Sequence, residues 1–333
     1  MNYRNVATLN QDIVSWSKEL PRDIDLIVGV PRSGLLAANL LALHMDLPLT
    51  DLEGLMEGRV FKSGKRNRFG DLGIYLDEPR NVLIVDDAEY TGQAITKAKD
   101  TINSAGLNHK IQYAVVYTAD RSKSQADYIC KELIMPQIFE WNLINHYHLR
   151  NTCMDIDGVF CIDPTCEEDD DGEKYRQYLI NTPPLLYPKK TIGWLVTCRL
   201  EKYRDLTEQW FERHGITYNN LVMMDYPDKA ARVAAGRDAA YKADIYKKTN
   251  ALLFIESSLD QAEDIARITG KHVLCTETNE LIEPGGIKRQ MQTFNRNKHL
   301  IFKDPLRFAK KLPGWLVKEA KRLYQSMEST KQS

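Results

Sequence analysis

Cysteine pairs, an excess of one charge and long apolar runs are all missing from this 333-residue sequence. Its six cysteines form no CxxC pair, which argues against a zinc site or a disulfide framework. The formal net charge of −1 predicts no general attraction to nucleic acid. The N-terminus lacks the charged start of a signal peptide, and the most apolar stretch, residues 34–49, is too short to span a bilayer. We therefore expect a cytoplasmic protein that has no nucleic-acid partner.

Short apolar runs, separated by segments long enough for helices, indicate α/β architecture with mostly parallel sheets. The length suits two domains, and a run that reads as the first strand of a new domain begins just after Asn151. We predict two doubly wound domains, at residues 1–149 and 151–285, followed by a basic helical tail at 286–333. The predicted strands lie at residues 25–30, 81–86, 111–118, 191–197, 251–256 and 271–275.

Two adjacent aspartates end the second of these predicted strands, in the stretch NVLIVDDAEYTGQAITKA. Ligands of open parallel sheets bind beyond the carboxyl ends of the strands, so a site is expected here. The Thr-Gly turn before a helix that begins near Gln93 presents backbone N–H groups and the positive end of the helix dipole, which suit a phosphate. Asp86 and Asp87 suit the hydroxyls of a sugar, or a magnesium ion. A sugar phosphate is the expected ligand.

A second strand, loop and helix, LIVGVPRSGLLAANLLA, carries an arginine and small residues that let the backbone approach an anion. Together the two stretches resemble the type I phosphoribosyltransferases, over roughly residues 1–149. The resemblance implies that the chain binds 5-phosphoribosyl-1-pyrophosphate with magnesium. It assigns the pyrophosphate to Val30, Pro31, Arg32, Ser33 and Gly34, the ribose hydroxyls to Asp86 and Asp87, and the 5-phosphate to Ala88, Glu89, Tyr90, Thr91, Gly92 and Gln93.

The segment between these motifs, residues 58–71, is rich in lysine and arginine. It is similar to the mobile loop that closes over pyrophosphate in the family, so Lys65 and Arg66 are expected to contact the donor. An acceptor hydroxyl also needs a base, for which Asp87 and Glu89 are the candidates. Nucleobase-salvage relatives often carry an acidic residue where this chain has Tyr90, and that departure argues against a purine acceptor.

The stretch CMDIDGVFCIDPT opens the predicted second domain with two aspartates two positions apart. With WLVTCR, a later lysine and a strand that ends in an acid, it resembles the haloacid dehalogenase superfamily. The resemblance implies a magnesium-dependent phosphatase with a minimal cap. In it, Asp155 would be the nucleophile and Asp157 the acid/base. Thr197, at the end of its strand, and Lys242 would hold the phosphoryl group. The metal would be bound by Asp155, the Asp157 backbone, Glu256 and Asp260.

Transfer of a phosphoribosyl group followed by dephosphorylation would leave a plain ribofuranosyl group on the acceptor. Because that order would undo nucleotide salvage, we expect a glycan or lipid-linked glycan as the acceptor. The chain resembles in this respect two-domain enzymes that add ribofuranose to bacterial polysaccharides. Two alternatives stay open: a nucleobase phosphoribosyltransferase fused to a nucleotidase, and a sensor of the diphosphate donor that regulates the phosphatase.

The tail has twelve lysines and arginines against three acidic residues from Gly286 onward. Its apolar residues between 304 and 327 are spaced among lysines, a pattern typical both of a helix at the inner membrane face and of a helix packed on the enzyme. The sequence leaves open which of the two applies, and whether the chain forms a homo-oligomer.

Overall fold

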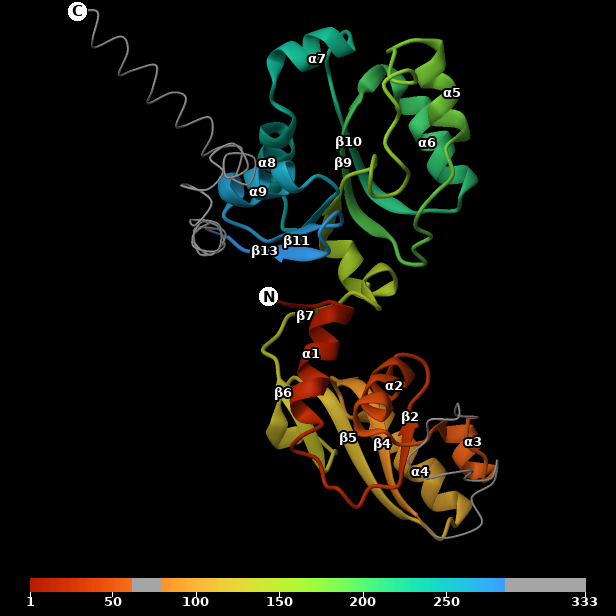
Figure 1. Cartoon of the computed structure of the whole chain (residues 1–333). Coiled ribbons are helices and arrows are strands. Elements are labelled where there is room, and N and C mark those ends of the chain that lie inside the picture. The colour runs from red at the N-terminus through yellow and green to blue at the C-terminus, as the bar shows by residue number, and fades with distance from the viewer. Residues whose placement is uncertain (62–79, 285–333) are drawn as a thin grey trace, which may run out of the picture. The chain divides into compact units, whose positions relative to one another are not determined.

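The computed structural model describes residues 1–61 and 80–284. They form two compact units, one from Met1 to Asn142 and one that begins at Leu143 (Figure 1). The expected lid residues Lys65 and Arg66, and the predicted tail with its 304–327 segment, lie outside the described residues. Among the helices that are described, none is long and apolar enough to cross a membrane.

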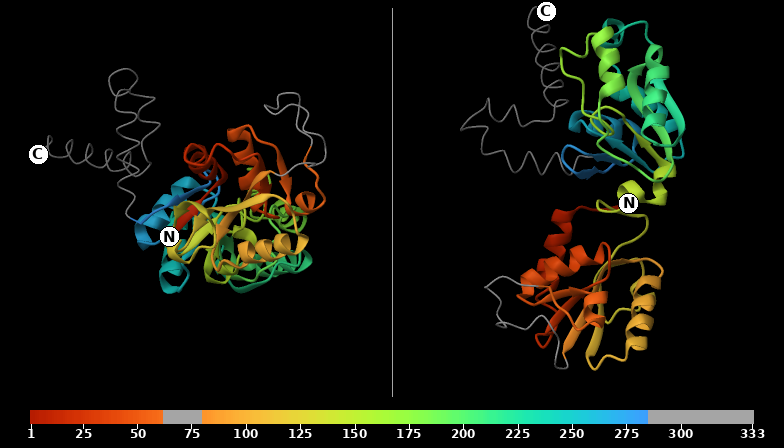
Figure 2. Two further views of the ribbon diagram at one scale, coloured as in Figure 1. Left: turned by 90° about the horizontal axis from the view of Figure 1, so that it is seen from below. Right: turned by 90° about the vertical axis from the view of Figure 1, so that its right-hand side faces the viewer.

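The first unit is built on a five-stranded, parallel sheet in the order β3-β2-β4-β5-β6. Leu83 and Val85 of β4 face a cluster with α1 and α2, whereas Val82 and Ile84 face one with α3 and α4. Figure 2 shows helices on either side of the sheet. The bounds are β2 Leu26–Gly29, β3 Leu49–Asp51, β4 Asn81–Glu89, β5 Lys110–Thr118, β6 Tyr128–Glu132, α1 Val6–Trp16, α2 Gly34–Met45, α3 Leu52–Met56, α4 Gln93–Ala105 and η1 Arg121–Lys123.

A separate two-stranded parallel sheet in the first unit pairs β1, Asn2–Arg4, with β7, Gln137–Phe139. Tyr3 lies opposite Ile138 in this ladder. The pairing brings the last segment of the unit back to its N-terminus, which fixes the residues that follow β7.

The second unit contains a six-stranded sheet in the order β10-β9-β8-β11-β12-β13, parallel except for the antiparallel edge strand β13. Helices α8 and α9 pack against β8, β11 and β12 through residues such as Tyr246, Phe254 and Ile265. The strands are β8 Thr152–Met154, β9 Ile192–Leu200, β10 Tyr218–Met224, β11 Leu253–Glu256, β12 Val273–Cys275 and β13 Glu280–Ile282. The helices are η2 Leu143–Asn145, η3 Tyr147–Asn151, α5 Glu173–Asn181, η4 Glu201–Tyr203, α6 Arg204–Arg213, α7 Lys229–Ala235, α8 Asp238–Lys248 and α9 Leu259–Thr269.

The predicted fold class, α/β with mostly parallel sheets, is confirmed, and all six predicted strands are present. Two predicted strand ends were wrong. We expected β4 to end at the aspartate pair, but its ladder with β5 continues to Glu89, opposite Thr118. We expected β9 to end at Thr197, but pairing with β10 resumes after an irregularity and reaches Leu200. In both cases the neighbouring strand still offers partners, so polar side chains do not end the strand.

Candidate active sites

The two motif loops of the first unit meet at the carboxyl ends of the adjacent strands β2 and β4. The Val30 amide donates to the Val85 carbonyl at 3.0 Å, which continues the ladder to the loop itself. Gly34 lies so close to β4 that a Cβ there would be 2.8 Å from Asp86 Oδ1 and 2.9 Å from the Val85 carbonyl oxygen. The predicted pyrophosphate loop, Val30 to Gly34, therefore lies directly against the end of β4 that carries the acidic pair.

Asp86 and Asp87 are both buried, with exposed fractions of 6% and 3%. The Asp87 amide donates to Asp86 Oδ1 at 2.9 Å. Burial and the neighbouring Asp87 charge raise the pKa of Asp86 to about 8. A carboxyl pair that repels its second negative charge in this way favours hydroxyl donors or a cation as its ligand.

The Thr-Gly turn leads into α4 as predicted, with the helix beginning at Gln93. Gly92 has φ +74°, a left-handed conformation that glycine adopts at little cost. No side chain caps this end of the helix, so its first amides face outward together with the positive end of the dipole. Tyr90 is 64% exposed on the same turn. The geometry suits a phosphate, as the motif predicts.

Glu89 lies beneath this turn. Its Oε1 accepts from the Gln125 amide at 3.0 Å, and a Cβ on Gly92 would lie 3.2 Å from the same oxygen. Its Oε2 is buried without a hydrogen-bond partner among the described residues. These contacts tie Glu89 to the loop that follows β5.

Two contacts that the sequence did not predict connect the end of the first unit to these loops. Trp141 Nε1 donates to Asp87 Oδ2 at 2.5 Å. Arg32 donates through Nη2 to Asn142 Oδ1 at 3.1 Å. The sequence places both partners in a segment without any recognisable motif, and only the pairing of β1 with β7 brings them here.

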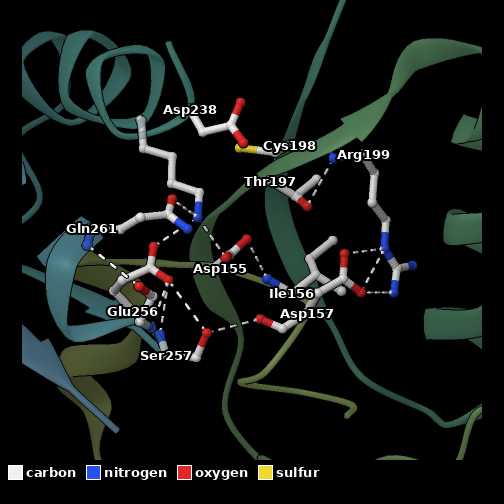
Figure 3. A network of polar contacts seen from close by, with 12 residues as sticks. Asp155, Ile156, Asp157, Thr197, Cys198, Arg199, Asp238, Glu256, Ser257 and Gln261 are labelled. Carbon is white, nitrogen blue, oxygen red and sulfur yellow. Dashed lines mark hydrogen bonds and ion pairs between the residues drawn. The ribbon is translucent and has the colours of Figure 1, made fainter. Parts of the chain in front are cut away.

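In the second unit, Lys242 holds together two of the predicted site carboxylates, Asp155 and Glu256, both of which Figure 3 labels. Its Nζ lies 2.6 Å from Asp155 Oδ2 and 2.7 Å from Glu256 Oε2, and it also donates to Gln261 Oε1 at 2.9 Å. The Lys242 side chain is 1% exposed and comes from α8, whereas Asp155 follows β8 and Glu256 ends β11. Four elements that are separated in sequence, β8, α8, β11 and α9, thus bring Asp155, Lys242, Glu256 and Gln261 together.

Asp155 is buried beside an excess of negative charge. Burial raises its pKa, Lys242 opposes that effect, and Glu256 and Asp157 add to it, so that the pKa rises to about 7. The Asp155 carboxyl also accepts from the Ile156 amide at 2.8 Å through Oδ1. The side chain is thereby held in one orientation, as a nucleophile requires.

Asp157 turns toward a different cation. Arg199, which is 2% exposed, donates through Nη2 to Asp157 Oδ1 at 2.6 Å and through Nε to Oδ2 at 3.2 Å (Figure 3). The Tyr178 hydroxyl lies 3.0 Å from the same Oδ1. Burial favours the neutral carboxyl, but the Arg199 charge and these hydrogen bonds outweigh it and lower the pKa of Asp157. Arg199 is a site residue to which sequence reasoning gave no role.

Of the remaining predicted site residues, Thr197 and Glu256 are buried and Asp260 is exposed. Thr197 is fully buried and its Oγ1 accepts from the Arg199 amide at 3.2 Å. Glu256 Oε1 accepts from the amides of Ser257 and Ser258 at 2.9 and 3.2 Å. Asp260 is exposed in the first turn of α9. In the part of the chain that the structure describes, no three histidine, cysteine or acidic side chains are grouped as metal ligands.

Residues 2–147 match the Phosphoribosyl transferase domain family. The Bifunctional protein PyrR of Lactococcus lactis subsp. cremoris is 28% identical over 141 residues, which cover 39% of this chain and 77% of that protein. The Pyrimidine operon regulatory protein of Lactococcus lactis subsp. lactis matches to the same extent.

Solved structures were matched over a similar share of the chain. The Xanthine-Guanine-Hypoxanthine Phosphoribosyltransferase of Helicobacter pylori is 17% identical, with a TM-score of 0.32, over 42% of this chain and 92% of that one. The purine phosphoribosyltransferase from Pyrococcus horikoshii is 20% identical, with a TM-score of 0.31 and the same coverage. Residues 2–147, less than half of the chain, are thus similar to phosphoribosyltransferase domains.

Proposed function

We propose that this chain transfers a 5-phosphoribosyl group from phosphoribosyl pyrophosphate to an acceptor hydroxyl and then removes the 5-phosphate. The observation that carries the first step is the meeting of the two anion loops at β2 and β4, within a domain that matches the phosphoribosyltransferase family. The second step is supported by the convergence of Asp155, Asp157, Thr197 and Lys242 in the second unit.

In the transfer step, the bond from ribose C1 to the pyrophosphate oxygen breaks and a bond to the acceptor oxygen forms. Residues Val30 to Gly34 would bind the departing pyrophosphate, and Ala88 to Gln93 the 5-phosphate. Asp86 and Asp87 would hold the ribose hydroxyls, which positions C1 between leaving group and acceptor. Asp87 or Glu89 would take the proton of the acceptor hydroxyl; each accepts one hydrogen bond, Asp87 from the Trp141 indole and Glu89 from the Gln125 backbone amide.

In the hydrolysis step, the Asp155 carboxylate attacks phosphorus while the bond from phosphorus to the ribose C5 oxygen breaks. Asp157 is paired with Arg199, so it would first have to take up a proton in the substrate complex; it would then protonate that oxygen and recover a proton from the water that hydrolyses the aspartyl phosphate. Lys242 offsets the charge of Asp155 and of the phosphoryl oxygens, and Thr197 would donate to one of them. Phosphate is released and Asp155 returns to its starting state.

Phosphoribosyltransferases generally use magnesium with phosphoribosyl pyrophosphate, and we propose this for the first unit. In the second unit the predicted ligands do not gather around a metal position, because Lys242 pairs Asp155 with Glu256 and Arg199 pairs Asp157. No step of the proposed hydrolysis is therefore assigned to a metal. Removal of metal with EDTA, followed by addition of magnesium chloride, tests whether transfer and hydrolysis each depend on magnesium.

The acceptor we propose is a glycan or a lipid-linked glycan, since the product of both steps carries an unphosphorylated ribofuranosyl group. The fused transferase and nucleotidase remains the second enzymatic reading, and consumption of the donor with free nucleobases would favour it. The relative from Lactococcus lactis subsp. lactis is named a Pyrimidine operon regulatory protein, which supports the sensor reading. Donor binding without turnover on any acceptor would favour the sensor.

The test uses an Asp155→Asn variant with phosphoribosyl pyrophosphate, magnesium and a panel of glycan and nucleobase acceptors. Mass spectrometry of the acceptors should show a phosphoribosyl adduct with the variant, and the same adduct without phosphate with the wild type. An Asp86→Asn variant is the control and should give neither product. If Asp155→Asn releases phosphate from the adduct as fast as the wild type does, the proposed hydrolysis step is contradicted.

A further inference from the structure

The segment that follows β7 contacts both donor-binding loops of the first unit through two consecutive residues. Trp141 donates to Asp87, in the predicted ribose site, and Asn142 accepts from Arg32, in the predicted pyrophosphate loop. Asp87 is 54 residues from Trp141 and Arg32 is 110 residues from Asn142 along the chain. Both contacts therefore depend on the fold, and a local sequence pattern cannot produce them.

The orientation of the Trp141 ring is fixed by a stack of aromatic rings. Phe139 lies between Trp141 and Tyr117, with ring centroids 5.1 and 5.4 Å away and an interplanar angle of 18° in each pair. Tyr117 is fully buried, and its hydroxyl donates to Asp12 at 2.8 Å. The stack thus runs from the core of the unit to the indole, and it directs the indole N–H toward Asp87.

The backbone around the stack is held as well. The Glu140 amide donates to the Arg4 carbonyl at 3.0 Å, and the Val6 amide donates to the Glu140 carboxylate at 2.7 Å. The Asn142 amide donates to the Phe139 carbonyl at 3.0 Å, which turns the chain back toward Arg32. Trp141 is consequently presented by a segment that is anchored on both sides.

An indole is well suited to hold a carboxylate that binds sugar hydroxyls. It has one N–H donor and no acceptor, so it cannot accept a hydrogen bond from a ribose hydroxyl and does not compete with Asp87 for that hydroxyl. Asp87 is 3% exposed, and a buried carboxylate needs donors for its oxygen atoms. A fixed donor on Oδ2 selects one rotamer of the carboxylate before the ligand arrives.

We infer that Trp141 is a positioning residue of the donor site, which holds the Asp87 carboxylate in the orientation that binds the ribose hydroxyls. The inference rests on the proposed role of Asp87 in the first unit. Asn142 has a lesser part, because its partner Arg32 is exposed and keeps its charge without this contact.

The experiment compares Trp141→Phe, which keeps the ring stack and loses the N–H, with Trp141→Ala, which loses both. Phosphoribosyl pyrophosphate with magnesium chloride is titrated into the full-length chain by calorimetry. We expect Trp141→Phe to weaken donor binding about tenfold, since the lost hydrogen bond is to a charged group, and to lower the unfolding temperature less than Trp141→Ala, which also loses the ring stack. Full affinity in Trp141→Phe with weak binding only in Trp141→Ala would show a packing role and overturn the inference.

Tryptophan fluorescence gives an independent readout. Donor binding should change the emission of the wild type and of a Trp194→Phe control, whose substitution lies in the second unit, and should change that of Trp141→Phe far less. A double-mutant cycle of Trp141→Phe with Asp87→Asn should be non-additive, because the two residues share one contact. If the wild type itself does not bind the donor, the proposed function fails. If it binds and Trp141→Phe binds equally, only the role of Trp141 fails.

Discussion

Asp86 is buried before any ligand neutralises it, and this has a consequence for stability. Its pKa is raised to about 8, against about 4 in an unfolded chain. Between these values the folded state holds a proton that the unfolded state has lost. The free energy of unfolding therefore decreases as the pH rises from about 4 to about 8.

Replacement of Asp86 by asparagine should remove this pH dependence. We expect Asp86→Asn to unfold at a higher temperature than the wild type at pH 8 and close to it at pH 5, while it loses donor binding. Thermal unfolding at the two pH values measures the effect. Asp100→Asn, an exposed position on α4, serves as the control and should follow the wild type. Parallel pH profiles for Asp86→Asn and the wild type would show that Asp86 is ionised in the folded chain.

Lys242 donates to two buried carboxylates and to Gln261, so its removal should affect both stability and hydrolysis. Lys242→Met leaves Asp155 and Glu256 without their shared cation, and breaking a buried ion pair costs about 3–5 kcal/mol. We expect a strongly lowered unfolding midpoint in urea and no measurable phosphate release. Lys247→Met, at an exposed position on the same helix, should change neither quantity. Normal stability in Lys242→Met would mean that the two carboxylates are not held by this lysine.

At the scale of elements, the sequence predicted which segments form strands far better than where those strands end. Apolar runs identify β4 and β9 because burial on both faces of a parallel sheet requires them. Their last residues depend instead on partners in β5 and β10, which lie elsewhere in the chain. An aspartate pair looked like the end of a strand, yet the ladder beside it continues.

In the candidate sites, too, some residues could be predicted from the sequence and others could not. The carboxylates and the Thr-Gly turn belong to compact motifs, so their positions could be predicted from the residues. Trp141 and Arg199 could not, because their partners are 54 and 42 residues away and nothing in the local pattern marks them. Residues that orient others become visible only when the fold brings their partners together.

The loop that follows β8 depends on a glycine for two separable reasons. Gly158 has φ +73°, and a Cβ there would lie 2.3 Å from Ser257 Oγ and 3.0 Å from Asp163 Oδ2. Ser257 Oγ in turn donates to the Asp157 carbonyl at 3.3 Å. A side chain at Gly158 would therefore displace the loop that carries Asp157.

Gly158→Ala should abolish phosphate release and lower the stability of the chain by a few kcal/mol, from backbone strain and crowding together. The control is Gly215→Ala, which has a similar φ of +65° but nothing within 4 Å of the added Cβ. It should cost about 1 kcal/mol and leave hydrolysis unchanged. Urea unfolding and phosphate release, measured on both variants, separate the two causes. Equal activity of the two alanine variants would show that the loop tolerates the displacement.

At the scale of the whole molecule, each unit has its own sheet, its own core and its own set of candidate site residues. The residues proposed for transfer all lie in the first unit, and those proposed for hydrolysis all lie in the second. Neither set takes a described residue from the other unit. A substitution that removes transfer is thus expected to leave hydrolysis intact, and a substitution that removes hydrolysis is expected to leave transfer intact.

Complementation between two inactive variants tests this independence. Asp86→Asn lacks transfer and Asp155→Asn lacks hydrolysis, so neither alone converts the acceptor to its ribofuranosyl product. We expect an equimolar mixture to form that product, because the phosphoribosylated acceptor released by Asp155→Asn can enter the second unit of Asp86→Asn. Mass spectrometry over time should show the phosphorylated adduct rise and then fall. An adduct that persists in the mixture, while Asp86→Asn hydrolyses the purified adduct, would mean that the intermediate is never released and that the two sites act within one chain.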